Sequence, residues 1–185
     1  MNPPAPRVLC LLIVGFEEIE TVAPVDLLRR AGAQVTLASV CGAAWVTGRC
    51  QVVIKADVPL SGVVARDFDL LMIPGGPGVA ALRADGQAAK LARDFHERGL
   101  PVAAICAAPT VLADAGLLIS KRYTAHGSVK NELPGLIEEA PVVEDGLIIT
   151  SRGAGTSIEF GLSLVKRLFG AEKARAIGQS ILWPH

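Results

Sequence analysis

The chain has 185 residues, of which 51% are apolar and 19% charged, and its 18 basic and 18 acidic side chains leave no net charge. This composition excludes a disordered chain, which needs low hydrophobicity and high net charge. It also provides no overall basic field, so we expect neither nucleic acid nor an acidic membrane surface as a primary partner. The length predicts one domain, placed over residues 1–185.

No segment predicts membrane insertion or export. The longest apolar run, Val8 to Phe16, ends at Glu17 and is far shorter than the ~20 residues of a spanning helix. Three early prolines and the lack of a small-residue cleavage site disfavour a signal peptide, so we expect a cytoplasmic protein. Neither a disulfide framework nor a zinc site is expected, because no C-x-x-C pair occurs among the four cysteines, Cys10, Cys41, Cys50 and Cys106.

The chain begins with a strand, helix, strand pattern. Residues 7–14 form an apolar run closed by Gly15, and residues 34–40 form a β-branched run. The segment between them has a helical period and ends in Arg29-Arg30 before Gly32, as helix C-termini do; its apolar positions are Ile19, Val22, Ala23, Val25, Leu27 and Leu28. We interpret residues 46–62 as an excursion at the sheet edge rather than a second domain.

The pattern then repeats. Residues 69–73 predict a strand, followed by the sequence Pro74-Gly75-Gly76-Pro77-Gly78 and a helix to about Arg98. A strand over 100–105, Cys106 and a helix to about Ala115 come next. Further along, two apolar runs flank Glu144-Asp145-Gly146, which predicts a hairpin, and a last helical region runs from near Thr156 toward Trp183.

Uniformly apolar strands that alternate with helices favour an α/β fold, a mostly parallel sheet with helices on both faces. In such sheets the ligand crevice lies beyond the carboxyl ends of the strands. Gly15, Gly75-Gly76 and Cys106 each follow a predicted strand, so we expect them to converge there.

Cys106 is the strongest candidate for chemistry. It stands between a strand and a helix, with alanines around it, which is typical of a nucleophile elbow. A thiol at a helix N-terminus meets unpaired N–H donors and the positive end of the dipole, which favour thiolate. The alternative, a small buried hydrophobe, is our interpretation of Cys10 inside the first strand; the roles of Cys41 and Cys50 stay open.

Three further sites accompany Cys106. Glu20 lies one turn into the first helix, either as a carboxylate that complements the helix dipole or as a partly buried acid with a raised pKa. The backbone at Gly75 and Gly76 either stabilises an oxyanion or forms an ordinary turn. His126 occupies a loop position from which it could reach Cys106.

These motifs occur together in one order, and the ordered set resembles the DJ-one branch of the ThiJ/PfpI superfamily. The segments that carry the resemblance are Gly15 to Thr21, Pro24 to Asp26, Leu71 to Gly76, Ala103 to Pro109, Asp145 to Gly153 and Gly155 to Ser157. The resemblance implies a flavodoxin-like sandwich and a homodimer, with no cofactor and no metal.

The resemblance also implies roles for individual residues. It implies a reactive cysteine at Cys106, a protonated glutamate at Glu20, an oxyanion hole at Gly76 and Ala107, and a histidine near the cysteine at His126. Arg30 and Arg49 resemble arginines that line an anion site near the dimer interface. This chain departs from the family pattern at Ala108, where glycine is frequent, and at Gly127, where proline is frequent.

Related proteins are described as cofactor-free glyoxalases that convert methylglyoxal to lactate and as deglycases that act on early glycation adducts. We therefore expect reactive aldehydes, or glycated amines and thiols, as partners, attacked by Cys106 to give a hemithioacetal. The alternative is an oxidative-stress sensor or redox-regulated chaperone in which Cys106 is oxidised and turnover is low. A peptidase is disfavoured, because Ala107 stands where an adjacent catalytic histidine would be.

Overall fold

A computed structural model describes residues 4–184; residues 1–3 and 185 of the expected domain lie outside the described part. Its centre is a seven-stranded sheet with the order β5-β2-β1-β6-β7-β9-β8, parallel throughout except for the β8-β9 pair. The strands are β1 (Arg7–Leu12), β2 (Gln34–Ser39), β5 (Val58–Pro59), β6 (Leu70–Ile73), β7 (Val102–Ile105), β8 (Val142–Asp145) and β9 (Ile148–Ser151).

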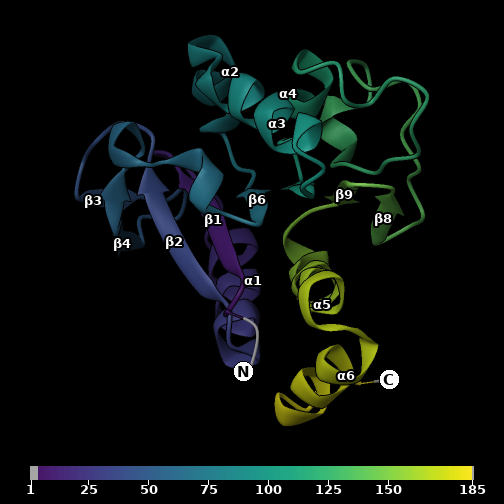
Figure 1. The fold of residues 1–185 in the computed structure, drawn as a ribbon. Coiled ribbons are helices and arrows are strands. Elements are labelled where there is room, and N and C mark those ends of the chain that lie inside the picture. The colour runs from purple at the N-terminus through teal and green to yellow at the C-terminus, as the bar shows by residue number, and fades with distance from the viewer. Residues whose placement is uncertain (1–3, 185) are drawn as a thin grey trace.

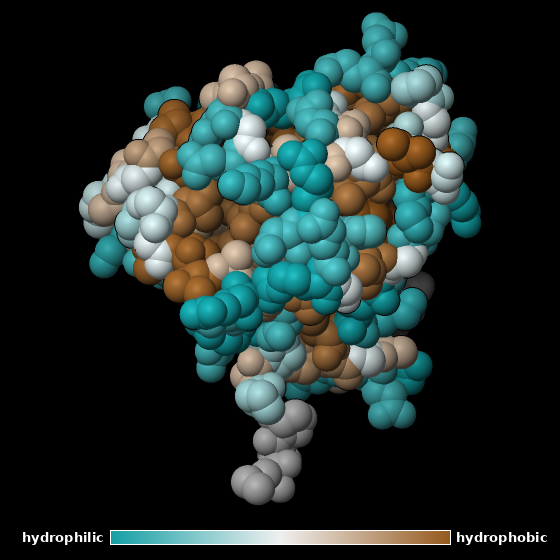
Figure 2. All heavy atoms as spheres, turned by 45° about the horizontal axis from the view of Figure 1, so that its top comes forward, coloured by the Kyte–Doolittle hydropathy of each residue, from teal (hydrophilic) through white to brown (hydrophobic). Residues whose placement is uncertain are grey.

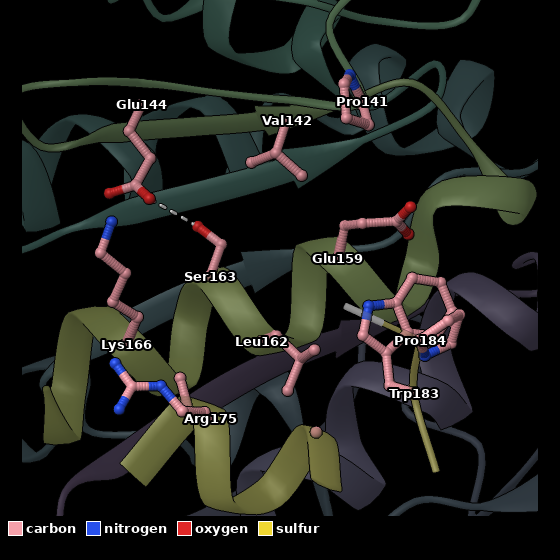
Figure 3. Close-up of a pocket in the computed structure, with 12 residues that line it drawn as sticks. Pro141, Val142, Glu144, Glu159, Leu162, Ser163, Lys166, Arg175, Trp183 and Pro184 are labelled. Carbon is pink, nitrogen blue, oxygen red and sulfur yellow. Dashed lines mark hydrogen bonds between the residues drawn. The ribbon is translucent and has the colours of Figure 1, made fainter. Parts of the chain in front are cut away.

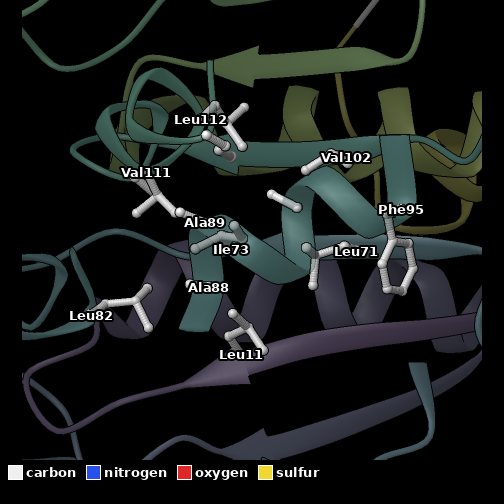
Figure 4. Packing of buried hydrophobic residues seen from close by; sticks show 14 of the residues in the cluster. Leu11, Leu71, Ile73, Leu82, Ala88, Ala89, Phe95, Val102, Val111 and Leu112 are labelled. Atoms are coloured by element: carbon white, nitrogen blue, oxygen red, sulfur yellow. The ribbon is translucent and has the colours of Figure 1, made fainter. Parts of the chain in front are cut away.

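Helices cover both faces of the sheet (Figure 1). One face carries α1 (Glu18–Ala31), α5 (Ser157–Phe169) and α6 (Ala171–Ser180); the other carries α2 (Val79–Asp85), α3 (Gln87–Glu97) and α4 (Pro109–Asp114). The predicted α/β fold class is therefore confirmed. Each layer has its own apolar core, and Figure 4 shows part of the one beneath α2, α3 and α4, where Phe95, Leu71 and Val111 are fully buried.

The predicted hairpin and edge excursion are both present. β8 and β9 pair antiparallel across the Glu144-Asp145-Gly146 turn, with Val142 opposite Ser151. The excursion forms a separate two-stranded hairpin, β3 (Trp45–Thr47) and β4 (Val53–Lys55), and then β5 at the sheet edge beside β2.

Two long helices predicted from the sequence are each divided by a glycine. The helix expected to reach Arg98 is α2 and α3, separated at Gly86, which has a φ of 74°. The last helical region is α5 and α6, separated at Gly170, with a φ of 89°. Apolar periodicity continues across both breaks because each pair of helices packs on the same face, so the pattern alone did not show the change of direction.

Two of the apolar positions that indicate the helix α1 lie on its exposed side. Ile19 and Val22 are 55% and 49% exposed, and they point away from the core. On the molecular face seen in Figure 2, apolar residues likewise reach the surface in several places between polar ones. Within residues 4–184, no helix combines the length and the apolar character needed to cross a bilayer.

Candidate active site

Cys106 lies at the carboxyl end of β7 in a conformation that confirms the predicted elbow. Its φ is 66°, in the left-handed region that a non-glycine residue adopts only at a cost of about 1–3 kcal/mol. Hydrogen bonds on both sides hold it there: its N–H donates to the Ser151 carbonyl at 2.9 Å, and its carbonyl accepts from the His126 N–H at 2.8 Å. Strand β9 and the His126 loop therefore fix the direction of the thiol.

The loop after β6 approaches Cys106 so closely that only glycine fits. A Cβ at Gly75 would lie 2.5 Å from the Cys106 Cβ and 2.5 Å from a Glu20 carboxyl oxygen. Gly76 has a φ of 100°, and a Cβ there would lie 2.4 Å from the Gly15 carbonyl oxygen. The expected convergence of the loops after β1, β6 and β7 is thus present.

Glu20 is fully buried at this junction. One carboxyl oxygen, Oε2, accepts a 3.0 Å hydrogen bond from the Gly75 N–H. The other, Oε1, is also buried and has no conventional hydrogen-bond partner among the described residues. Burial raises the pKa of Glu20 to about 7, against smaller lowering effects from hydrogen bonding with Cys106 and from the positive charge of Arg49. Of the two interpretations of Glu20, the structure supports the acid with a raised pKa.

The pKa of Cys106 does not follow the sequence prediction. A helix N-terminus was expected to favour thiolate, but burial and the neighbouring Glu20 carboxylate raise the Cys106 pKa to about 12, while the Gly76 and Ala107 N–H groups lower it. The effect of burial on the pKa is larger than that of the helix dipole, because α4 has only six residues and the loops at Gly75, His126 and Gly153 surround Cys106.

Cys106 and Glu20 therefore titrate as a pair. Between pH of about 7 and 12 the pair holds one proton, which lies on either the sulfur or the carboxyl group. When Glu20 holds it, Cys106 is a thiolate that faces a carboxylic acid and two backbone donors.

The backbone N–H groups of Gly75 and Gly76, in the loop after β6, have different roles. The N–H groups of Gly76 and Ala107 face the Cys106 sulfur and donate to no backbone acceptor, which fits the expected oxyanion hole. Gly75 was predicted to belong to the same hole, but its N–H is occupied by Glu20, so Gly75 positions the acid instead.

His126 lies beside the thiol, in an exposed loop. Its ring carbon Cδ2 and the Cys106 Cβ are 3.4 Å and 3.9 Å from the Cβ that a side chain at Gly153 would carry. Its Nδ1 accepts from the Ser128 N–H at 3.2 Å and lies 2.8 Å from the Ser128 hydroxyl. A backbone N–H can only donate, so a neutral ring carries its proton on Nε2. This arrangement favours His126 as a hydrogen-bond donor rather than a base.

The two arginines predicted near the site behave differently. Arg49 is on the loop after β3, and its charge acts on Glu20 of the same chain. Its N–H donates to Phe16 at 2.9 Å. Arg30 is near the far end of α1, about 15 Å of helix beyond Glu20, and pairs with Asp26 at 2.6 Å. Within one chain, Arg30 does not belong to the Cys106 site, and its role at a dimer interface stays a prediction.

The other cysteines occupy unrelated positions. Cys10 is fully buried in β1, where burial raises its pKa, in agreement with a small core residue. Cys41 and Cys50 are exposed, and the Ser39 hydroxyl lowers the Cys41 pKa. The Cys50 N–H donates to Glu18 at 2.7 Å, which ties the Arg49 loop to the start of α1.

Sequence reasoning missed the contribution of residues 151–156. Gly153 faces both Glu20 and Cys106, with a φ of 159°, and Thr156 holds this loop through a 3.2 Å hydrogen bond from the Gly153 N–H. The sequence indicates only that a helix starts near Thr156, and it is the pairing of β7 with β9 that brings this segment to the thiol. Within residues 4–184, no three His, Cys, Asp or Glu side chains gather as a metal site.

A larger cavity of about 670 Å³ lies elsewhere, between β8, α5 and α6 (Figure 3). Its polar side chains include Lys166 and Arg175 on one side and Glu159 near Trp183 on the other. Neither Cys106 nor Glu20 lines this cavity.

The α/β sheet thus brings together a strained cysteine at the elbow, a buried acid and two free N–H donors, the features that a nucleophilic thiol site requires. The chain belongs to the DJ-1/PfpI family, whose model matches residues 6–167. This confirms the resemblance noted in the sequence.

Known relatives agree along almost the whole chain. Protein dj-1beta of Drosophila melanogaster is 38% identical over 178 residues, which cover 94% of this chain and 95% of that protein. Its crystal structure superposes with a TM-score of 0.91 over 98% of this chain and 100% of that one. The glutathione-independent glyoxalase DJR-1.2 of Caenorhabditis elegans is 35% identical over 167 residues, 87% of each chain.

Proposed function

We propose that the protein is a cofactor-independent glyoxalase that converts methylglyoxal and related 2-oxoaldehydes to 2-hydroxy acids, in the cytoplasm. The observation that carries this proposal is the hydrogen-bonded pair of the Cys106 thiol and the buried Glu20 carboxyl group, which two free N–H donors face. The similarity to a protein named a glutathione-independent glyoxalase supports it. Removal of early glycation adducts follows from the same chemistry, because the thiolate also attacks the carbonyl carbon of such adducts.

The first step forms a bond between sulfur and the aldehyde carbon. With Glu20 protonated, the Cys106 thiolate attacks that carbon, and the oxygen gains negative charge at the Gly76 and Ala107 N–H groups. Glu20 then gives its proton to this oxygen, which completes a hemithioacetal. The step forms C–S and O–H bonds, consumes the shared proton and leaves a carboxylate beside the C–H bond of the hemithioacetal carbon.

The second step moves hydrogen within the substrate. The Glu20 carboxylate takes the proton from the former aldehyde carbon and returns it to the adjacent carbon, while the hydroxyl proton passes to the second oxygen beside His126 Nε2–H. One carbon is oxidised and its neighbour reduced, so no external oxidant is required. Water then cleaves the resulting thioester, releases the hydroxy acid and restores the thiolate and the protonated Glu20.

Lactate formation from methylglyoxal tests the proposed function. We expect the purified protein, treated with a chelator and free of glutathione, to form lactate in proportion to its concentration. Alkylation of Cys106 should stop the reaction. If lactate is undetectable while mass spectrometry shows Cys106 reduced, the glyoxalase proposal is wrong.

Replacement of His126 separates the enzyme from a redox sensor. We expect His126→Ala to lower lactate formation by about 10²–10³-fold, the usual cost of removing a hydrogen-bond donor to an oxygen that gains negative charge. Peroxide oxidation of Cys106 should change little, because that step needs only the thiolate and its donors. A sensor would instead show negligible lactate and efficient sulfinate formation in both proteins, which intact-mass measurements would detect.

We also propose a homodimer, formed through the outer face of α1. The exposed side chains of Ile19, Val22, Val52 and Leu182 line one apolar groove of about 670 Å³. An exposed apolar surface of this kind is typical of a protein interface, and a second copy would bury it.

Light scattering tests the dimer. We expect a mass of twice 19.3 kDa for the unmodified protein and 19.3 kDa for Val22→Glu, which places a charge in the groove. Ile119→Glu is the matched control, since Ile119 is also exposed but lies outside the groove. A monomeric mass for the unmodified protein at micromolar concentration would contradict this proposal.

A further inference from the structure

A cavity of about 480 Å³ adjoins the thiol site and has no role in the steps above. Two loops enclose it: His126 and Gly127 on one side, and Arg152 to Thr156 on the other. The open side faces solvent, because Arg152, Gly155 and His126 are exposed.

Gly153 lines this cavity and also neighbours Glu20 and Cys106, so the cavity lies next to the catalytic residues. The α-carbon of Gly153 has no side chain between the cavity and the thiol, and a Cβ there would lie 3.6 Å from Glu20 Oε1 and 3.9 Å from the Cys106 Cβ. The cavity is therefore within reach of a short chain attached to Cys106.

The lining of the cavity favours an anion. Arg152 is its charged side chain, and no acidic residue lines it. Among the described residues no carboxylate lies within ion-pair distance of Arg152, whereas Arg83 pairs with both Asp114 and Glu132. The N–H groups of Ala154 and Gly155 also donate to no backbone acceptor. The cavity thus offers a guanidinium group and backbone donors that lack a partner within the protein.

We propose that Arg152 is a specificity-determining residue that binds a carboxylate on the substrate tail, so that the preferred substrates are 2-oxoaldehydes carrying a carboxylate a few bonds from the reacting carbon. The reaction of these substrates rests on the proposed glyoxalase function, whereas the binding of the carboxylate by Arg152 does not. A guanidinium group pairs with a carboxylate through two parallel hydrogen bonds, which gives both affinity and orientation. A neutral substrate such as methylglyoxal would use the same Cys106 chemistry without this contact.

The probe is 4,5-dioxopentanoate, a 2-oxoaldehyde with a terminal carboxylate, compared with its neutral methyl ester. Two readouts apply: the kcat/KM for hydroxy-acid formation, and protection of Cys106 from iodoacetamide by reversible hemithioacetal formation. The variant is Arg152→Gln. The matched control is Arg175→Gln, which removes an arginine from the separate cavity of Figure 3.

We expect the unmodified protein to prefer the acid over the ester by about 10- to 100-fold in both readouts, as one charge-assisted contact provides. Arg152→Gln should abolish this preference, and Arg175→Gln should behave like the unmodified protein. Equal rates and protection with acid and ester, unaffected by Arg152→Gln, would overturn the subsite and leave the proposed function intact. Preferential protection by the acid without any hydroxy acid would overturn the proposed function and leave the subsite intact. Absence of protection by either probe would overturn the subsite.

Discussion

Replacement of Cys106 by either alanine or glycine is expected to lower lactate formation by roughly 10⁴-fold or more, because the nucleophile and its neighbours act as a unit. The two variants should nevertheless differ in stability. Cys106 has a φ of 66°, and alanine keeps the strain of that conformation whereas glycine adopts it freely. We expect Cys106→Gly to be about 1 kcal/mol more stable than Cys106→Ala in urea unfolding.

Ala113 provides the control for this comparison. It lies within helix α4, where glycine costs about 1 kcal/mol, so Ala113→Gly should be less stable than the unmodified protein. Opposite signs at the two positions would show that the elbow stores strain to aim the thiol. If Cys106→Gly is the less stable of the two position-106 variants, or if either keeps measurable activity, Cys106 is not a strained nucleophile.

The parts of the site that the sequence predicted correctly are those set by local pattern. A strand that ends at Ile105 and a helix that begins at Pro109 leave Cys106 in the turn, whatever the rest of the chain does. Gly75 and Gly76 follow β6 for the same reason. The carboxyl ends of adjacent parallel strands share one edge of the sheet, so their meeting was predictable too.

The parts that were wrong or missed depend on tertiary environment. The pKa of Cys106 is raised because three loops bury it, and burial cannot be read from neighbouring residues alone. Gly75 was assigned to the oxyanion hole, but its N–H is taken by Glu20, which is 55 positions away in the chain. Gly153 and Arg152 join the site only through the β7-β9 pairing.

The exposure of Ile19 and Val22 has a similar explanation. Apolar periodicity in α1 indicates which positions share a face, but not whether the core or another surface covers that face. A helix whose inner side packs on the sheet and α5 can carry a second apolar stripe for a partner. The sequence therefore predicts the helix correctly but does not show whether its outer side contacts solvent or a partner.

Glu20→Gln is expected to change both the pH dependence of the reaction and the stability of the fold. In the unmodified protein, lactate formation should rise as pH increases through about 7, where the Cys106–Glu20 pair loses the first of its two protons. Glutamine is nearly isosteric and still accepts from the Gly75 N–H, but it neither donates an acidic proton nor takes one back. We therefore expect a rate lower by about 10²–10⁴-fold, without the step near pH 7.

The same raised pKa predicts the sign of the stability change. The folded protein holds the Glu20 proton up to about pH 7 and the unfolded chain only up to 4.5, so the proton stabilises the fold below 4.5 and this contribution is lost as pH rises to 7. The loss is about 3 kcal/mol for a shift of this size. We expect urea unfolding to show that the free energy of unfolding of Glu20→Gln, relative to that of the unmodified protein, is higher at pH 8 than at pH 5. Glu172→Gln, at an exposed site on α6, should show no such difference. Identical pH profiles of stability for Glu20→Gln and the unmodified protein would mean that Glu20 is not the buried acid that shares a proton with Cys106, since a carboxyl group that keeps its proton for function must destabilise the fold when it loses it.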